Sequence, residues 1–171
     1  MAERLHRAYL ALGSNIDPER NLVEALRLLS RHGNPLAVSR IYQTAPIGFA
    51  NQPDYLNAAV LLETSATLAE LREWIVPEVE AALGRVRMPG NPNAPRTIDV
   101  DVALFDREVI HAANCRVPDP DILTRPFVAI PLAELDPDYV HPEEERTLRE
   151  IAASFQPSQA AMRLRPDVRL A

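Results

Sequence analysis

The stretch RTIDVDVALF, residues 96–105, alternates apolar and polar side chains along one short segment. A period of two is typical of a β-strand, in which neighbouring side chains point to opposite faces. Asp99 and Asp101 are therefore expected to project together from one face. The apolar side chains at every second position are expected to enter a core: Ile98, Val100, Val102 and Leu104.

The chain on either side of this strand predicts a mixture of strands and helices. Residues 55–64 contain an apolar run that indicates a strand buried on both faces. Thr67 and Glu70 form a capping box that opens a helix, which Pro77 is expected to kink or split. Further helices are expected over 127–135 and 147–153. With no repeat and no linker, these elements predict one α+β domain over residues 1–171, with 154–171 as a C-terminal tail.

Composition excludes several classes of function. The chain has 171 residues, of which 47% are hydrophobic, so it can bury a core and is not disordered. A net charge of −6 argues against a nucleic-acid binder. All 18 basic residues are arginine, which excludes a Schiff-base lysine and a Walker-type phosphate lysine. The five glycines form no glycine-rich phosphate loop.

Cysteine content and the N-terminal sequence predict a cytoplasmic protein without a membrane partner. A single cysteine, Cys115, allows no intrachain disulfide and fits a reducing compartment, where it is expected to be a small packed side chain. The first 15 residues contain no apolar stretch long enough for a signal peptide or an anchor.

The paired carboxylates carry the strongest chemical signal. The Cα atoms of Asp99 and Asp101 are expected about 6.6 Å apart, close enough to share a pair of metal ions roughly 3.5–4 Å apart. Arg85, Arg87 and Arg96 lie nearby in sequence and suit phosphate oxygens. All-oxygen ligands favour Mg²⁺ over zinc. The alternative, an acidic strand edge facing solvent, would be favoured for an isolated D-x-D.

The segment QPDYLNA, residues 52–58, carries a second signal. Tyr55 and Asn57 share one strand face, and an aromatic plane beside a carboxamide suits a flat, hydrogen-bonding heterocycle. The alternative is an aromatic residue packed on the core beside an asparagine in a turn or cap.

Several motifs together, in order and with compatible spacing, resemble the 6-hydroxymethyl-7,8-dihydropterin pyrophosphokinase family of folate biosynthesis. The resemblance runs from about Tyr9 to about Ala153. It rests on LGSN (12–15), SRIYQTAPIG (39–48), QPDYLNA (52–58), ETSATLAEL (63–71), EAALGRVR (80–87), PRTIDVDVALF (95–105), VPDPDILTRPFV (117–128) and PLAEL (131–135). It implies a ferredoxin-like α+β fold, with helices on a mainly antiparallel sheet. It also implies transfer of pyrophosphate from ATP to the pterin hydroxymethyl group, with release of AMP.

The resemblance also implies roles for individual residues. Asp99 and Asp101 would hold two Mg²⁺ ions, and Arg85 and Arg96 would be the catalytic arginines. The implied ATP-binding residues are Glu80, Arg87, Arg96, Val102 (through its backbone) and Arg125. The implied pterin-binding residues are Thr44, Ile47 (through its backbone), Tyr55, Asn57 and Phe127. A monomer that acts on ATP and the pterin alcohol is expected.

Three residues depart from the family pattern, all on the ATP side. Asp119 replaces a common histidine, Asn93 stands near the place of an aromatic residue, and Pro77 replaces a glutamine. Asp119 is expected either to pair with Arg116 or Arg125 or to turn into solvent. The departures leave two alternatives open: a pterin- or nucleotide-binding paralogue without turnover, and another Mg²⁺-dependent phosphoryl or nucleotidyl transferase.

Overall fold

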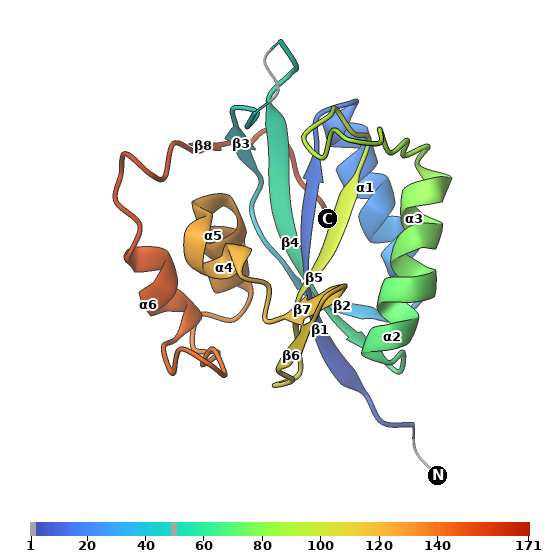
Figure 1. Ribbon diagram of the computed structural model, residues 1–171, viewed down its shortest axis with the longest axis vertical. Helices are drawn as coiled ribbons and strands as arrows, with labels where there is room; N and C mark the ends of the chain where they lie inside the picture. Colours follow the sequence, from blue (N-terminus) through green and yellow to red (C-terminus); the bar gives the residue numbers. More distant parts are fainter. Residues whose placement is uncertain (1–2, 49–50) are drawn as a thin grey trace.

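The computed structural model describes residues 3–48 and 51–171, and its centre is a six-stranded antiparallel sheet (Figure 1). The strands run in the order β5-β1-β4-β3-β8, and β2 pairs with a further part of β4. Their bounds are β1 His6–Ser14, β2 Asn34–Val38, β3 Tyr42–Thr44, β4 Tyr55–Thr64, β5 Asp99–Phe105 and β8 Arg163–Leu164. A separate hairpin joins β6, Ile110–Ala112, to β7, Cys115–Val117.

Helices cover both faces of the sheet, as Figure 1 shows. One face carries α1 Pro18–Leu29 and the continuous segment α2 Leu68–Glu70, η1 Leu71–Ile75 and α3 Val76–Ala82. The other carries α4 Asp121–Thr124, α5 Pro126–Leu135 and α6 Leu148–Ala153. The predicted α+β architecture is confirmed. Among the described residues, no helix has the length and apolar character needed to cross a membrane.

Strand β4 divides the core into two layers because its side chains alternate between the two faces. Leu56, Val60 and Leu62 join the cluster under α1 and α3, whereas Ala59 and Leu61 join the cluster under α5 and α6. The strand predicted over 55–64 is therefore confirmed, both in its bounds and in its burial on both faces.

Strand β5 follows the predicted alternation only to Val102. The pairing register with β1 shifts between Tyr9 and Leu10, so that Ala103 is the extra residue on β5. Such a bulge reverses the faces of the residues beyond it. Leu104 therefore packs in the α5 layer, and its predicted place beside Val100 and Val102 is wrong.

Pro77 lies inside the helical segment without breaking it. The segment opens at the predicted Thr67–Glu70 capping box. A π-helical turn, η1, then precedes Pro77, and the amide of Val76 donates to the carbonyl of Leu71. A π turn accommodates a residue that has no N–H to contribute to the α-helical ladder.

Candidate active site

A pocket opens where the ends of β1, β4 and β5 face α4 and the start of α5. It is lined by Ala11, Leu12, Gly13, Thr44, Ala45, Ile47, Tyr55, Asn57, Pro92, Asn93, Arg96, Asp99, Asp101, Asp119, Asp121, Arg125, Phe127 and Val128. The structure thus brings most of the predicted site residues to one place. An adjoining hollow under the loop 85–96 adds Arg85 and Arg87 beside the same two aspartates.

Gly13 lies on the floor of the pocket, between its two sides. In the sheet it pairs with Asp99 of β5 on one side and with Asn57 of β4 on the other. A β-carbon at Gly13 would lie 3.6 Å from the amide oxygen of Asn57 and 3.9 Å from the Tyr55 ring. The missing side chain therefore leaves the floor open to a ligand that touches both sides.

On the first side, which we call the carboxylate side, two aspartates and two arginines meet: Asp99, Asp101, Arg85 and Arg96. Asp99 accepts hydrogen bonds from Arg85 Nη1 at 2.5 Å and from Arg96 Nη1 at 3.0 Å. The side chain of Arg85 is only 8% exposed, so its ion pair with Asp99 is shielded from solvent. The arginines thus neutralise one member of the aspartate pair.

Asp101 differs from Asp99 in its surroundings. Among residues 3–48 and 51–171 its carboxylate forms no hydrogen bond and no ion pair. Although the residue is partly exposed to the pocket, restricted hydration of its carboxylate and then the charge of Asp99 raise its pKa to about 7. Asp101 is therefore a carboxylate without a direct ion-pair partner, and the nearby charge of Arg85 only partly offsets these effects.

Glu80, on α3, binds the side chains of Arg85 and Arg87. It is 5% exposed, and Oε1 accepts hydrogen bonds from Arg85 Nη1 at 3.1 Å and from the amide of Val100 at 3.2 Å. Oε2 accepts one from Arg87 at 3.1 Å. Glu80 thus ties α3 to β5 and orients Arg85, whereas the side chain of Arg87 remains 73% exposed. The side chain of Val102 packs in the core under α1 and α3, so only its backbone can reach a ligand.

On the second side, which we call the aromatic side, the strands β3 and β4 present Thr44, Tyr55 and Asn57, and α5 presents Phe127. The amide group of Asn57 donates to Thr44 Oγ1 at 2.8 Å and to the carbonyl of Tyr42 at 3.3 Å. Asn57 and Thr44 are 6% and 9% exposed. Hydrogen bonds within the sheet therefore fix these polar groups. Tyr55 and Asn57 both line the pocket, in agreement with the strand face predicted for them.

Two further predicted residues lie at the rim of the aromatic side: Ile47, predicted to bind the pterin, and Arg125, predicted to bind ATP. Ile47 follows β3 and is 53% exposed, and it lines the pocket. The guanidinium carbon of Arg125 lies 5.7 Å from the centre of the Phe127 ring, and its Nε lies 3.2 Å from the carboxylate of Asp121.

Asp119 takes neither of its two expected positions. Its carboxylate lines the pocket and accepts a hydrogen bond from the amide of Asp121 at 2.9 Å. Arg125 pairs with Asp121 instead, because the two are one helical turn apart. Burial raises the pKa of Asp119, and the nearby charge of Arg125 only partly opposes this. The prediction of an arginine pair or of an outward side chain is wrong.

Sequence reasoning gave no role to Asn15, which links the two sides. It is 2% exposed, and its amide oxygen accepts from the backbone N–H of Arg96 at 2.9 Å. Its amide nitrogen donates to Gln52 Oε1 at 2.7 Å, and Gln52 in turn donates to the carbonyl of Asn93 at 2.9 Å. The only local signal was the tetrapeptide LGSN, whose partners are distant in sequence.

Comparison with known proteins agrees with this geometry. The family described as 7,8-dihydro-6-hydroxymethylpterin-pyrophosphokinase matches residues 9–137. The chain belongs to this family. It is 44% identical over 131 residues to the 2-amino-4-hydroxy-6-hydroxymethyldihydropteridine pyrophosphokinase of Bacillus subtilis, covering 75% of this chain and 77% of that one. It is 39% identical over 155 residues to the Methylorubrum extorquens protein of the same name, covering 89% and 95%. The predicted family is confirmed.

The fold also resembles a solved structure, that of wild-type Plasmodium falciparum HPPK-DHPS. The TM-score is 0.70 at 13% identity, over 89% of this chain and 45% of that one. This pyrophosphokinase therefore spans less than half of the Plasmodium chain. The likeness confirms the ferredoxin-like arrangement of an antiparallel sheet with helices packed on it.

Proposed function

We propose that the two sides of this pocket bring ATP and 6-hydroxymethyl-7,8-dihydropterin together, so that the pyrophosphoryl group passes to the pterin hydroxyl and AMP leaves. This is the reaction that the family name describes, a step of folate biosynthesis. The proposal rests on one observation. Gly13 has no side chain to separate the carboxylate side from the aromatic side, so the two sides adjoin within one cavity.

Asp99 and Asp101 are the proposed ligands of two Mg²⁺ ions. Bound there, Mg²⁺ would neutralise ATP phosphate oxygens and acidify the attacking hydroxyl. The residues fit such ions, because Asp101 lines the pocket and its carboxylate has no direct ion-pair partner among the described residues. No three His, Cys, Asp or Glu side chains cluster into a metal site within the described part of the chain. Mg²⁺ with a nucleotide needs only one or two carboxylates, since phosphates and water complete its shell.

Arg85 and Arg96 are proposed to stabilise the charge that develops as the β-phosphorus is transferred. Both guanidinium groups contact Asp99, so both lie where the phosphates would approach the aspartates. Phosphoryl-type transfer depends mainly on positioning and on neutralised charge, which suits a site without lysine. Glu80, Arg87, Arg125 and the backbone of Val102 are proposed to support ATP binding, with Glu80 acting through the arginines that it holds.

Thr44, Asn57, Tyr55 and Phe127 are proposed to bind the pterin. The ring would lie between the aromatic side chains of Tyr55 and Phe127, with the backbone of Ile47 at its rim. Asn57 is held by Thr44 with its amide oxygen directed to the Gly13 floor, where a pterin N–H can donate to it. A flat heterocycle with polar edges matches a slot of this kind.

Incubation with ATP, Mg²⁺ and the pterin alcohol tests the function. AMP and the pterin pyrophosphate are the expected products. ADP would indicate another Mg²⁺-dependent phosphoryl transferase, and binding of both substrates without AMP would indicate a paralogue without turnover. We further propose a monomer, because one chain supplies every proposed site residue. We also propose a cytoplasmic location, since a single cysteine fits a reducing compartment. Sedimentation at the enzyme's working concentration tests the oligomeric state.

A further inference from the structure

The C-terminal segment, residues 163–170, returns to the sheet and adds a strand beside β3. Leu164 pairs with Tyr42 and Arg163 with Gln43. The amide of Arg165 donates to the carbonyl of Ile41 at 2.9 Å. The segment ends in the core under α1, where Leu170 is 6% exposed. It lies beyond residues 9–137, which match the family.

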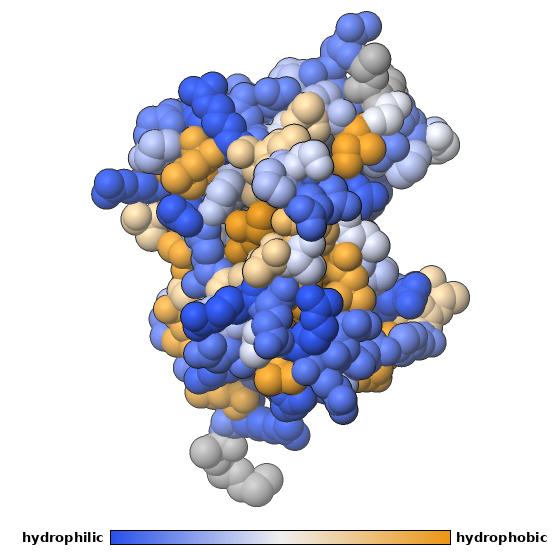
Figure 2. All heavy atoms as spheres, turned by 90° about the vertical axis from the view of Figure 1, so that its left-hand side faces the viewer, coloured by the Kyte–Doolittle hydropathy of each residue, from blue (hydrophilic) through white to orange (hydrophobic). Residues whose placement is uncertain are grey.

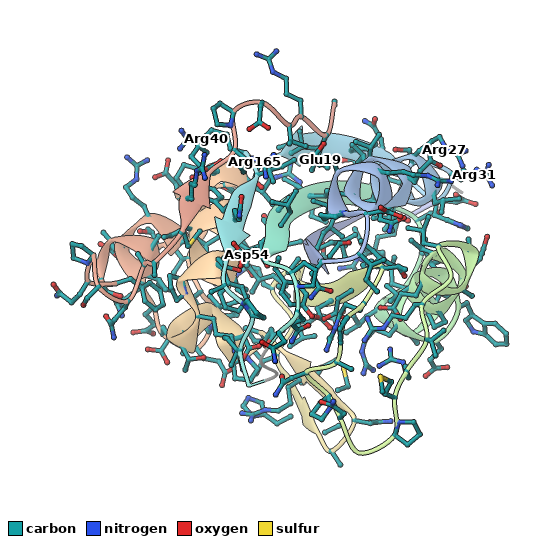
Figure 3. The ribbon with its side chains drawn as sticks, turned by 90° about the horizontal axis from the view of Figure 1, so that it is seen from above. Glu19, Arg27, Arg31, Arg40, Asp54 and Arg165 are labelled. Atoms are coloured by element: carbon teal, nitrogen blue, oxygen red, sulfur yellow. The ribbon has the colours of Figure 1, made fainter. Side chains whose placement is uncertain are left out.

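Arg165 joins this segment to two other elements. Its Nη1 donates to Gln43 Oε1 on β3 at 3.0 Å, and its Nη2 donates to Glu19 Oε1 on α1 at 2.9 Å. Both Nε and Nη2 also bind the carboxylate of Asp167, at 2.9 and 2.7 Å. Figure 3 shows Arg165 beside Glu19. Its side chain is 20% exposed, so its position is fixed by contacts from three directions.

The strand that Arg165 holds carries part of the aromatic side. Strand β3 has only three residues, and its last residue, Thr44, accepts the hydrogen bond from Asn57. Gln43, the partner of Arg165, also donates through Nε2 to Asp54 Oδ2 at 2.8 Å, directly before Tyr55. A short strand opens locally unless neighbours on both sides hold it. Arg165 is therefore linked through Gln43 and Asp54 to the residues that directly precede Thr44 and Tyr55.

We propose that Arg165 is a positioning residue for the pterin, which acts through Gln43 to fix β3 and the loop end before β4. This inference rests on the proposed pterin site. A purely structural C-terminal segment would affect thermal stability but not the relative affinities for the two substrates. Positioning of β3 would instead weaken pterin binding and spare the nucleotide, because Arg165 contacts no residue of the carboxylate side.

The test compares Arg165→Ala with Arg163→Ala by calorimetric titration of a non-reactive pterin analogue and of a non-hydrolysable ATP analogue with Mg²⁺. Arg163 lies in β8 and Arg165 directly follows that strand, but the Arg163 side chain is exposed and forms no hydrogen bond or ion pair within the described residues. We expect Arg165→Ala to weaken the pterin analogue about three- to tenfold and to leave the ATP analogue unchanged. Arg163→Ala should match the wild type for both ligands.

Two further measurements separate positioning from loss of stability. Hydrogen exchange of the β3 amides should accelerate in Arg165→Ala and not in Arg163→Ala. Arg165→Lys should recover only part of the pterin affinity, because an ammonium cannot bind three partners in the geometry of the planar fork. In turnover, KM for the pterin should rise in Arg165→Ala while kcat stays near the wild-type value.

Titration of Asn57→Ala in parallel distinguishes failure of the positioning role from failure of the proposed pterin site. Weaker pterin binding in Asn57→Ala together with wild-type affinity in Arg165→Ala would overturn the positioning role and keep the pterin site. Unchanged pterin binding in Asn57→Ala would instead reject the proposed pterin site. Equal weakening of both ligands in Arg165→Ala would show a general structural role and would also overturn the inference.

Discussion

The aromatic side and the carboxylate side of the pocket are held by different kinds of contact. Thr44 and Asn57 lie on paired strands, and each meets a neutral hydrogen-bond partner inside the sheet. On the carboxylate side, Arg85 and Arg96 reach Asp99 from the ends of a loop, and the contacts are between ions. The aromatic side is therefore fixed by hydrogen bonds within the sheet. The carboxylate side is held by ion pairs, for which a charged ligand can compete.

This difference bears on how each substrate binds. A pterin that enters the aromatic side finds its polar partners already oriented, so little conformational entropy is lost. A nucleotide polyphosphate must compete with Asp99 for two arginines, and Mg²⁺ must share that aspartate with them. Figure 2 shows the face that carries α5 and α6, where apolar surface appears in separate patches between polar residues.

Substitution of Asp99 or Asp101 is expected to have the largest effect on turnover. The two substitutions should differ in their effects on stability. Asp99→Asn and Asp101→Asn should each reduce turnover at least about a thousandfold, because each removes a proposed metal ligand. Their effects on stability without Mg²⁺ should have opposite signs. Asp99→Asn loses two ion pairs and should lower the free energy of unfolding by about 1–3 kcal/mol.

Asp101→Asn should instead raise the melting temperature at pH 8 without Mg²⁺. Its carboxylate has no direct ion-pair partner among the described residues, and a pKa near 7 means that its ionisation at that pH destabilises the fold. Scanning calorimetry of both variants, with and without Mg²⁺, measures this. A stabilised Asp99→Asn protein would show that the arginine pairs contribute nothing, and near-normal turnover in either variant would reject the two-metal assignment.

The arginines provide the next largest effect. Arg85→Ala and Arg96→Ala should lower kcat about a hundredfold to a thousandfold, with a smaller change in KM for ATP, if their charge acts mainly during transfer. Arg87→Ala is the matched control, because Arg87 shares Glu80 with Arg85 but is largely exposed. Lysine should rescue poorly, since a single ammonium does not reproduce the bidentate fork. A pure KM effect would assign both arginines to ground-state binding of ATP.

On the aromatic side, Asn57→Ala should weaken a non-reactive pterin analogue about ten- to a hundredfold, because a buried polar edge of the ring would lose its partner. The ATP analogue should bind as before. Loss of affinity for both ligands would mean that the two sides are not independent, and Asn15 would be the first residue to examine as their link.

The sequence predicted the elements whose signals are local. The strand over 55–64, the capping box at Thr67, and the common face of Asp99 and Asp101 all depend on residues within a few positions of one another. Such patterns follow from backbone periodicity and local hydrogen bonding. Local patterns therefore predicted a common strand face for Asp99 with Asp101 and for Tyr55 with Asn57, and both pairs line the pocket.

Features that depend on distant partners were not predictable in this way. The bulge at Ala103 arises from the register with β1, and nothing in the stretch 96–105 marks it. Strand β8 exists because two residues of the C-terminal segment meet β3 about 120 positions away. Asp99 and Asp101 look alike in sequence, but only in the folded chain do both arginines form ion pairs with Asp99, while Asp101 has no ion pair among the described residues.

The smallest expected effect concerns Asp119, whose charge lies at the boundary of the two sides. Asp119→Asn keeps an oxygen that can accept from the amide of Asp121, so the local turn should survive. The substitution removes a negative charge from a pocket that receives a polyphosphate. Affinity for the ATP analogue should therefore rise, by less than about tenfold or roughly 1.4 kcal/mol. Affinity for the pterin analogue, which is uncharged, should not change.

Two controls make the Asp119 prediction specific. Glu144→Gln removes the same charge from an exposed turn outside the pocket, and it should leave nucleotide affinity unchanged. Asp121→Asn frees Arg125 from its ion pair, and it should also strengthen nucleotide binding if Arg125 contributes to it. The salt dependence distinguishes a charge effect from a shape effect, since only the former fades as ionic strength rises. A large loss of nucleotide affinity in Asp119→Asn would show that this carboxylate contacts the nucleotide or its metal directly, and the carboxylate side would then contain three functional aspartates.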